Sequence, residues 1–301
     1  MSATAPRWIV TGASGFIGRV FAGCAPRDSV RVALGGDDWR ERIAAAPWRG
    51  ATVYHLAARV HQPQGDESLF ERDNVAKTIE LAQAAASAGA RRLVFLSTIK
   101  VNGDETLDRA FRPDDPPAPR DAYARSKWAA EKALLEISQA RGLSLAIVRA
   151  PLVIGAGAGG NLRSLMRFAD GPWPLPFAAI DNRRTFVCVE DLARLLAICG
   201  SSPDARGDIF FAGDPQPVST PRLVACIRSA WNRPARLFRV DARNLERIAA
   251  LAGLRERVGR LTRSLEVDVS DTIRRLAWKP AIDMEAGIAR MARAYHAHAG
   301  A

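Results

Sequence analysis

Short apolar runs alternate with longer helix-like segments through the first half of the chain. Five runs rich in β-branched and aromatic side chains predict strands, at residues 8–11, 30–34, 52–56, 93–97 and 145–149. Between the last three of these runs, residues 74–88 and 122–141 have helical spacing. Strands and helices that alternate in this way form a parallel sheet covered by helices on both faces.

The second half of the chain is richer in loops and helices. Residues 155–160 form a glycine-rich loop, and helices are expected near 162–168 and 190–198. Short strands are expected at 185–189 and 209–211.

The C-terminal third is expected to form a smaller lobe. Ser219 followed by Thr220 and Pro221 is typical of a helix start, because the hydroxyl caps the helix and proline suits its first turn. The rest of the chain is mostly helical. The predicted boundaries place residues 1–150 and 183–213 in a sheet domain, and residues 151–182 and 214–301 in a helix-rich lobe.

The composition is that of an ordinary folded protein. Of 301 residues, 48% are hydrophobic and 25% are charged, which excludes a disordered or collagen-like chain. No apolar run approaches the roughly 18 residues that span a bilayer, and residues 1–7 lack the features of a signal peptide. We therefore expect a cytoplasmic protein with no stable membrane insertion. The four cysteines form no Cys-x-x-Cys pair, so we expect reduced thiols and no metal site.

The chain carries a formal net charge of +11, and 38 of its 43 basic residues are arginine. This surplus is compatible with nucleic acid, an anionic membrane surface or an anionic small substrate. The basic residues are scattered, and no repeat alternates aromatic with basic side chains. A phosphate-bearing substrate is therefore favoured over nucleic acid, and a steep salt dependence of DNA or RNA retention would reverse this interpretation.

A nucleotide-binding loop is expected directly after the first strand. The sequence reads Thr-Gly-Ala-Ser-Gly-Phe-Ile-Gly over residues 11–18. Gly12 permits a tight turn, Gly15 lets the main chain approach a pyrophosphate, and Gly18 lets the helix pack against the strand. The helix N-terminus then offers N–H groups to phosphate. The order of strand, loop and helix favours a dinucleotide site.

Candidate acid–base residues lie at the start of the predicted helix 122–141. Tyr123 and Lys127 are four residues apart and share one helix face. A nearby ammonium lowers the pKa of a phenol, so we expect Tyr123 to exchange protons near neutral pH. Ser97 and Thr98 end a predicted strand, at the edge of the sheet where ligands bind. A hydroxyl there can hydrogen-bond a carbonyl or alcohol oxygen of a substrate.

Taken in this order, the motifs resemble those of the extended short-chain dehydrogenase/reductases, in particular the branch of nucleotide-sugar epimerases and dehydratases. The resemblance covers nearly the whole chain and implies an α/β fold, a Rossmann-type doubly wound parallel sheet with a smaller helix-rich substrate lobe. It also implies a homodimer formed through the helices that contain Asn74 and Tyr123. It assigns catalysis to Tyr123, Lys127 and Thr98. It assigns dinucleotide contacts to the glycine loop and the strand ends, namely Gly12, Ser14, Gly15, Phe16, Ile17, Gly18, Leu56, Ala57, Ala58, Asn74, Ser97, Tyr123, Lys127 and Pro151.

The same resemblance implies a nucleoside-diphosphate sugar as substrate. It assigns substrate contacts to Thr98, Lys100, Asn161 and Arg184, the last of which lies where the family binds the diphosphate. A guanidinium suits this role because its planar fork makes bidentate phosphate contacts. The run Ser-Thr-Ile-Lys-Val-Asn-Gly at 97–103 is similar to a subgroup that acts on bacterial surface polysaccharide sugars. That subgroup includes UDP-sugar 4-epimerases and 4-keto-sugar reductases.

The stretch between the first predicted helix and His55 is shorter than in the family. Either a second strand ends at Leu34, or the family's second and third strands are merged into one. Two glycines and then Asp37 and Asp38 follow, about twenty residues after the glycine loop. An acid at this distance favours the ribose of NAD, so NAD is the expected cofactor and NADP the alternative.

The resemblance implies an epimerase that works through a transient 4-keto sugar. Tyr123 takes the proton from the sugar hydroxyl at carbon 4 while hydride passes to nicotinamide. Lys127 lowers the pKa of Tyr123 and holds the nicotinamide ribose, and Thr98 hydrogen-bonds the sugar oxygen. The alternatives are a 4-keto-sugar reductase and a non-catalytic dinucleotide-binding protein. A dehydratase is disfavoured because Ile99, and no carboxylate, follows Thr98.

Overall fold

Six parallel strands form the main sheet of the protein. The computed structural model describes residues 7–60, 66–251 and 253–299. The strands are β1 (Trp8–Thr11), β2 (Val30–Val32), β3 (Thr52–His55), β4 (Arg92–Thr98), β5 (Ser144–Ala150) and β8 (Asp208–Phe211). Their order is β2-β1-β3-β4-β5-β8. Five of these strands match the predicted runs of the first half, and β8 matches the later run at 209–211.

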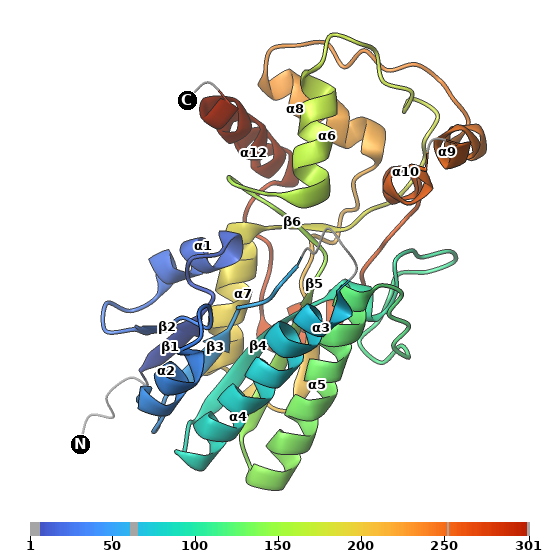
Figure 1. Ribbon diagram of the computed structural model, residues 1–301. Coiled ribbons are helices and arrows are strands. Elements are labelled where there is room, and N and C mark those ends of the chain that lie inside the picture. Colours follow the sequence, from blue (N-terminus) through green and yellow to red (C-terminus); the bar gives the residue numbers. More distant parts are fainter. Residues whose placement is uncertain (1–6, 61–65, 252, 300–301) are drawn as a thin grey trace.

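Helices cover both faces of this sheet (Figure 1). One face packs against α2 (Trp39–Ala45), α4 (Lys77–Ser87) and α5 (Ala122–Arg141). The other packs against α1 (Phe16–Cys24), α7 (Val189–Ser201) and α11 (Ser270–Leu276). Alternate strand residues enter the two cores, as Ile9 and Val53 do on the first face and Val10 and Tyr54 on the second. The predicted α/β fold is confirmed.

Among the described residues, one strand, β2, lies on the far side of β1. A Rossmann sheet in the order 3-2-1-4-5-6 has two strands there, so the structure matches the merged alternative. β1 pairs with β2 on one side and with β3 on the other, with Thr11 opposite His55. The chain therefore leaves β1 and β3 in opposite directions, and the crevice between their carboxyl ends is where such sheets bind ligands.

The helix predicted at residues 74–88 begins earlier and is not uniform. A short α3 (Glu67–Phe70) leads into a π-helical turn, η1 (Glu71–Ala76), and then into α4. Asp66 caps α3 by accepting a hydrogen bond from the Ser68 amide at 3.0 Å. A π-turn is common at functional sites, because the extra residue changes the direction of nearby side chains.

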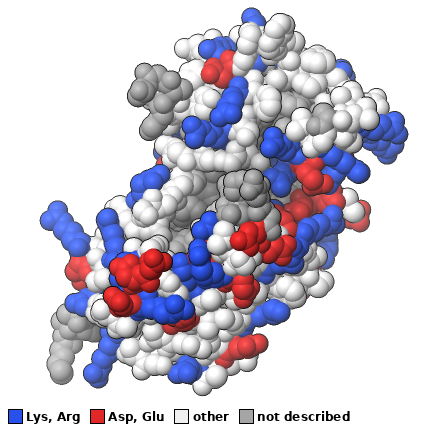
Figure 2. All heavy atoms as spheres, in the orientation of Figure 1, with Lys and Arg blue, Asp and Glu red and all other residues white. Residues whose placement is uncertain are grey.

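The second half forms a lobe above the carboxyl end of the sheet (Figure 1). Its short parallel strands, β6 (Leu152–Ile154) and β7 (Phe186–Cys188), pair separately from the main sheet. β6 was not predicted, because only Pro151 separates it from β5. A third core holds α6 (Gly160–Asp170), α8 (Thr220–Ala230) and α12 (Met284–Ala299) together. Figure 2 shows a waist between the lobe and the sheet domain.

Two further helices, α9 (Ala242–Leu251) and α10 (Arg255–Thr262), lie at the side of the lobe away from α12 (Figure 1). The short 3₁₀ turns η2 (Ile99–Val101) and η3 (Pro203–Ala205) follow β4 and α7. Ser219 caps α8 as predicted, since its hydroxyl accepts a hydrogen bond from the Arg222 amide at 3.4 Å. Within the described ranges, no helix combines the length and apolarity that a membrane span requires.

A buried ion pair fixes α5 against the sheet. The Arg149 guanidinium, at the end of β5, donates to both Glu131 carboxylate oxygens at 2.6–3.2 Å. Its remaining branch donates to Asn102 Oδ1, just after η2, at 2.9 Å. Both charged side chains are buried, so each depends on the other for its counter-charge.

The close packing at Gly18 can be tested against a second glycine of the same helix. A Cβ at Gly18 would overlap the Gly12 carbonyl oxygen, whereas a Cβ at Gly23 meets nothing within 4 Å. We expect Gly18→Ala to lower the free energy of unfolding by about 1–3 kcal/mol. Gly23→Ala should raise it by up to about 1 kcal/mol, because alanine favours the helix. Urea denaturation of both variants measures the difference, and equal effects would contradict this packing.

Candidate active site

The glycine loop lies at the carboxyl end of β1, against the chain that leaves β3. Gly12 has φ +71°, and a Cβ there would lie 2.5 Å from the Ala57 nitrogen. Gly18 packs on Gly12 from the first turn of α1. Gly15 is exposed, and its Cβ would approach only the Gly12 oxygen, at 3.3 Å. A side chain at position 12 or 18 would therefore collide with the main chain of the protein. At position 15 the main chain faces solvent, so a ligand can approach it. Residues 56–58 follow β3 directly beside this loop.

Phe16 brings the glycine loop into contact with the second lobe. Phe16 lies against the loop that follows β6, where its ring is 3.3 Å from a Cβ built on Gly155. Ile17 packs against the core of the sheet domain. Ser14 is exposed, and its carbonyl accepts a hydrogen bond from Arg19 Nη1 at 2.7 Å. The glycine loop therefore joins the sheet domain to the lobe.

A buried histidine links β1 and β3 to α4. Thr11 Oγ1 lies 2.6 Å from His55 Nδ1, and His55 Nε2 lies 2.8 Å from Thr78 Oγ1. Thr78 donates its proton to the Asn74 carbonyl at 2.7 Å. Thr78 must then accept from His55 Nε2–H, so Nδ1 accepts from Thr11. Burial, assisted by Lys127, lowers the pKa of His55 to about 3, which keeps the ring neutral.

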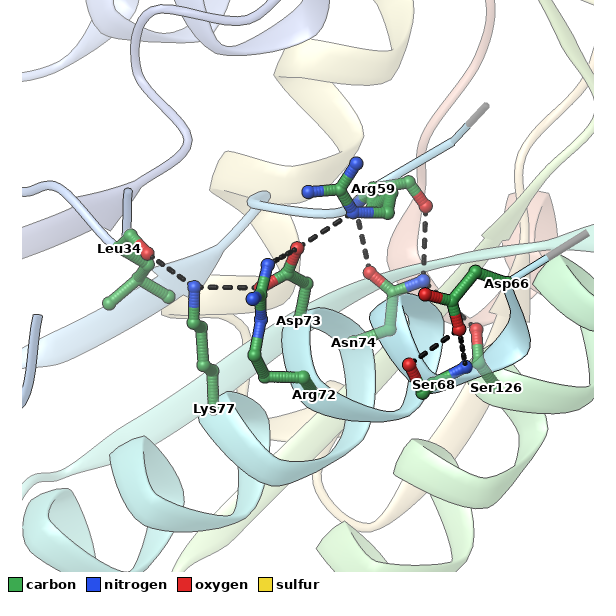
Figure 3. Close-up of polar contacts among 9 residues, drawn as sticks. All are labelled: Leu34, Arg59, Asp66, Ser68, Arg72, Asp73, Asn74, Lys77 and Ser126. Atoms are coloured by element: carbon green, nitrogen blue, oxygen red, sulfur yellow. Dashed lines mark hydrogen bonds and ion pairs between the residues drawn. The ribbon is translucent and has the colours of Figure 1, made fainter. Parts of the chain in front are cut away.

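Asn74 connects this network to the helix that carries Tyr123 (Figure 3). Its amide nitrogen donates to the Arg59 carbonyl at 3.0 Å and to Ser126 Oγ at 2.9 Å. Its oxygen accepts from the Arg59 amide at 2.8 Å. Ser126 Oγ donates in turn to the Tyr123 carbonyl at 2.8 Å. Both amide protons of Asn74 are used within the protein, so the residue orders the site from within.

Asp73 accepts hydrogen bonds from three cationic side chains near the end of β2 (Figure 3). Its carboxylate accepts from Arg59 Nε at 2.7 Å, Lys77 Nζ at 2.8 Å and Arg72 Nε at 3.0 Å. Although burial acts to raise it, hydrogen bonds from these cations hold the pKa of Asp73 well below its usual range. Lys77 also donates to the Leu34 carbonyl at 2.8 Å. The π-turn is thereby tied to the end of the shortened sheet edge.

The two acids expected near the adenosine ribose are both exposed. Asp38 forms an ion pair with Arg42, which also donates to the Ala33 carbonyl at 2.7 Å. Its charge is therefore compensated within the protein. Asp37 lies close enough to Arg72 to interact with its charge.

Lys127 is a buried cation with an unusual environment. Its side chain is 1% exposed, and Nζ lies 3.8 Å from the centroid of the Phe95 ring on β4. Within the described ranges its ammonium makes no hydrogen bond and no ion pair. Burial lowers its pKa to about 7, although Glu131 acts in the opposite direction. Because this buried ammonium has no hydrogen-bond partner among the described residues, its N–H groups are available to hydrogen-bond the hydroxyl groups of a bound ligand.

The prediction that Lys127 lowers the pKa of Tyr123 is contradicted. Tyr123 lies in the first turn of α5, with its ring centroid 6.4 Å from that of Phe70. Burial, and then the negative charge of Asp121, raise the pKa of Tyr123 above its ordinary value. The phenol is therefore protonated at neutral pH, because burial and the Asp121 charge both favour its neutral form.

The end of β4 carries two hydroxyl groups in different states. Ser97 Oγ is buried and has no hydrogen-bond partner among the described residues. Thr98 Oγ1 accepts from the Lys100 amide at 3.3 Å, so its own proton remains to be donated. Pro151 is buried at the end of the neighbouring strand. The orphaned Ser97 hydroxyl, the Lys127 ammonium and the open main chain at the glycine loop fit the ribose hydroxyls and pyrophosphate of a dinucleotide.

Lys100 does not offer an uncompensated charge to a substrate. Its ammonium forms an ion pair with Asp121, the cap of α5, and a second one with Asp104 at 3.4 Å. The expectation that it meets a diphosphate is therefore weakened, because both carboxylates compete for it.

Arg184 and Arg260 form a positive pair on the lobe side of the crevice. Arg184 is buried, and its Nη1 donates to the Arg263 carbonyl at 3.0 Å. Burial and the adjacent Arg260 lower its pKa to about 10. Arg260 donates to Asn161 Oδ1 at 3.4 Å. In the part of the chain that the structure describes, neither guanidinium forms an ion pair with a carboxylate, so the pair suits an anion.

Sequence reasoning missed Arg260. It lies in the run Arg-Glu-Arg-Val-Gly-Arg at 255–260, which is typical of a solvated helix. Only the folding of α10 back onto Asn161 and Arg184 gives it a place in the crevice. No local signal could have identified it.

The depressed pKa of Lys127 predicts a pH-dependent gain in stability on its removal. Below pH 7 the folded protein must bury a cation that the unfolded chain leaves in water, so Lys127→Met should raise the free energy of unfolding by about 2–4 kcal/mol. Between pH 7 and 10 the gain should shrink, because the folded amine is already neutral. Denaturation of protein stripped of bound nucleotide, at pH 6 and pH 9.5, measures this. Lys132→Met, at an exposed position of the same helix, is the control. A gain independent of pH would contradict the burial of a charged amine.

Comparison with known proteins gives one consistent family. The family model described as the NAD dependent epimerase/dehydratase family matches residues 25–213. A UDP-glucose 4-epimerase of Vibrio cholerae is 32% identical over 310 residues, 95% of this chain and 94% of that protein. A dTDP-4-dehydrorhamnose reductase of Streptomyces griseus is 33% identical over 207 residues, 65% of this chain and 66% of that protein.

A solved structure is similar over the whole fold. RMD from Pseudomonas aeruginosa, complexed with NADPH, superposes with a TM-score of 0.77 and 18% sequence identity, covering 97% of this chain and 100% of that one. The expected class of cofactor, a nicotinamide dinucleotide, is that of the matching family. The glycine loop, the Tyr123–Lys127 helix and the family model agree, and the chain belongs to the NAD-dependent epimerase/dehydratase family of extended short-chain dehydrogenase/reductases.

Proposed function

We propose that the protein is a 4-epimerase of a nucleoside-diphosphate sugar, with NAD as its tightly held cofactor. The observation that carries the proposal is the buried Lys127 ammonium, one helical turn after Tyr123, which makes no hydrogen bond or ion pair among the described residues and lies over the face of the Phe95 ring. The buried Ser97 hydroxyl, also without a hydrogen-bond partner among the described residues, ends the strand that carries Phe95. The 32% identity with a UDP-glucose 4-epimerase over 95% of the chain supports the substrate class.

In this mechanism, three side chains act on the sugar. Tyr123 exchanges a proton with the oxygen at sugar carbon 4. Thr98 donates its remaining proton to the same oxygen and holds it in place. Lys127 holds ribose hydroxyls of the cofactor. The bound dinucleotide supplies the acceptor and donor of hydride.

The raised pKa of Tyr123 decides when it can act as a base. Burial and Asp121 hold the phenol protonated before the site is filled. Positive charge near the phenol favours the tyrosinate, so the ligands of the filled site must supply it. Proton removal from the sugar hydroxyl is therefore expected to be efficient only in the assembled complex.

On the lobe side, Arg184 and Arg260 bind the substrate diphosphate, and Asn161 orients Arg260. Two guanidinium groups without carboxylate partners gain most from an anion of this kind. Residues 151–182 and 214–301 then form the sugar-nucleotide lobe, and residues 1–150 and 183–213 hold the dinucleotide. The protein works as a homodimer formed through α4 and α5.

A 4-keto-sugar reductase is the second candidate, favoured by the raised pKa of Tyr123. A phenol held in its protonated form is suited to donate a proton to a keto oxygen. Identity with a dTDP-4-dehydrorhamnose reductase over 65% of the chain points the same way. In this case reduced cofactor enters from solution.

The nucleotide released from purified protein distinguishes the two. An epimerase returns the hydride to the sugar that gave it, so NAD should be released in nearly one-to-one ratio on denaturation. The protein should then interconvert a UDP-sugar and its 4-epimer without added cofactor. Protein that releases no nucleotide and consumes NADH or NADPH with a 4-keto sugar is a reductase, and binding of neither cofactor would contradict both.

Removal of the phenolic hydroxyl should abolish turnover but spare cofactor binding. We expect Tyr123→Phe to lower kcat by about 10²–10⁴-fold, the usual contribution of a positioned acid–base group. Bound dinucleotide should be unchanged, because Lys127 and the glycine loop remain. Tyr295→Phe, in α12 of the lobe, is the control. Unchanged turnover in Tyr123→Phe would remove Tyr123 from the mechanism and favour a non-catalytic binding protein.

A further inference from the structure

The hairpin of α9 and α10 exposes apolar side chains at its tip. Leu251 is 92% exposed and Ile248 is 62% exposed, and they lie three residues apart on one face of α9. Leu254 is 41% exposed in the turn that follows. Phe238, before α9, is also exposed. Single exposed leucines are ordinary, but neighbouring ones on an unpartnered face indicate a binding surface.

This apolar tip is surrounded by arginines. Residues 233–260 contain eight arginines and three acidic residues. Figure 2 shows basic side chains at the edge of the lobe where Figure 1 places these helices. Five of the arginines are exposed, and their side chains make neither a hydrogen bond nor an ion pair with any described residue, namely Arg239, Arg243, Arg247, Arg255 and Arg257.

The acidic side chain at the centre of the hairpin is turned inward. Glu246 accepts from Thr262 Oγ1 at 2.6 Å and forms an ion pair with Arg263 at 3.2 Å. The packed side of α9 therefore uses this carboxylate, and the exposed side keeps arginine with leucine and isoleucine. The result is a basic amphipathic surface.

We propose that the α9–α10 hairpin binds the surface of an anionic lipid bilayer. Leucine and isoleucine at the tip enter the boundary between headgroups and acyl chains, while the arginines contact lipid phosphates around them. A helix with apolar residues on one side and arginines beside them is the common form of such an interfacial element. No part of the hairpin crosses the bilayer, because ten- and eight-residue helices are too short.

Charge complementarity favours lipid over two other occupants. In a two-fold dimer through this face, the unpaired arginines of two copies would lie opposite one another and repel. Nucleic acid would use the arginines but leave Leu251 and Ile248 in water, because phosphate contacts require no apolar tip. An anionic bilayer uses both parts of the surface.

The hairpin is joined directly to the candidate substrate site. Asn182 Nδ2 donates to the carbonyl of Leu261, at the end of α10, and Arg184 donates to the carbonyl of Arg263, at 3.1 and 3.0 Å. Docking would therefore bring the lobe side of the crevice close to the membrane surface. The proposal does not depend on the epimerase reaction, and the two can fail separately.

Sedimentation with vesicles tests the proposal. We expect the full chain to bind vesicles of phosphatidylglycerol and phosphatidylcholine in roughly equal parts at least about tenfold more tightly than vesicles of phosphatidylcholine alone. Binding should weaken as salt rises to about 0.5 M, since screening removes the arginine contribution. Leu251→Ser and the pair Arg243→Gln with Arg247→Gln should each weaken binding by about tenfold.

Matched variants separate the patch from general charge and hydrophobicity. Leu107→Ser removes a leucine outside the hairpin that is 88% exposed. Arg27→Gln with Arg31→Gln removes two exposed arginine charges, as the hairpin pair does, but in the sheet domain and away from the hairpin. Both should bind as the parent does, and all variants should keep their thermal unfolding midpoint and turnover of a soluble substrate.

Three results would overturn the proposal. The first is no binding to the anionic vesicles at physiological salt, or binding that the control variants weaken equally. The second is a change of oligomeric state in Leu251→Ser, which would assign the tip to a contact between copies. The third is retention of nucleic acid that needs Arg243 and Arg247 but is indifferent to Leu251.

Discussion

The ion pair between Arg149 and Glu131 is the constraint on which the site depends. It is buried on both sides, so neither charge can move into water without leaving the other unpaired. Because Arg149 also holds Asn102, three elements meet at this point: the end of β5, the middle of α5 and the turn after β4. Two of these elements hold the reacting groups, since α5 carries Tyr123 and Lys127, and Thr98 lies at the end of β4 just before the turn. The Arg149–Glu131 ion pair therefore fixes the positions of the reacting groups, although none of them takes part in it.

Two polar networks extend this constraint across the sheet. The chain from Thr11 through His55 and Thr78 joins the glycine loop to the π-turn, and Asn74 carries it to the helix of Tyr123. Since the His55 ring stays neutral to about pH 3, this network keeps its hydrogen-bond directions throughout the physiological range. The glycine loop and the helix of Tyr123 are thus connected through uncharged groups.

What the sequence could predict was local. The glycine loop, the Tyr123–Lys127 pair and the strand end at Ser97 and Thr98 each lie within eight residues. Their patterns can therefore be recognised in the sequence without knowing the fold. The π-turn, the environment of Lys127 and the approach of Arg260 to Arg184 depend on contacts between distant segments. The pKa of Tyr123 shows the limit most clearly: a neighbouring lysine suggested a lower value, but burial, which no spacing reveals, raises it. Likewise, Lys100 had a suitable position in sequence, but its carboxylate partners were recognisable only in the structure.

The shortened sheet leaves β2 as an open edge. An open edge offers unpaired main-chain groups on which a strand from another molecule can align, and this is a common route to aggregation. Here β2 is only three residues long, and Arg31 at its centre is exposed. Such an edge is too short and too charged to act as a template for another strand. The sheet therefore ends on this side in a strand that resists pairing with another molecule, and the Lys77 hydrogen bond to the Leu34 carbonyl fixes the chain that follows it.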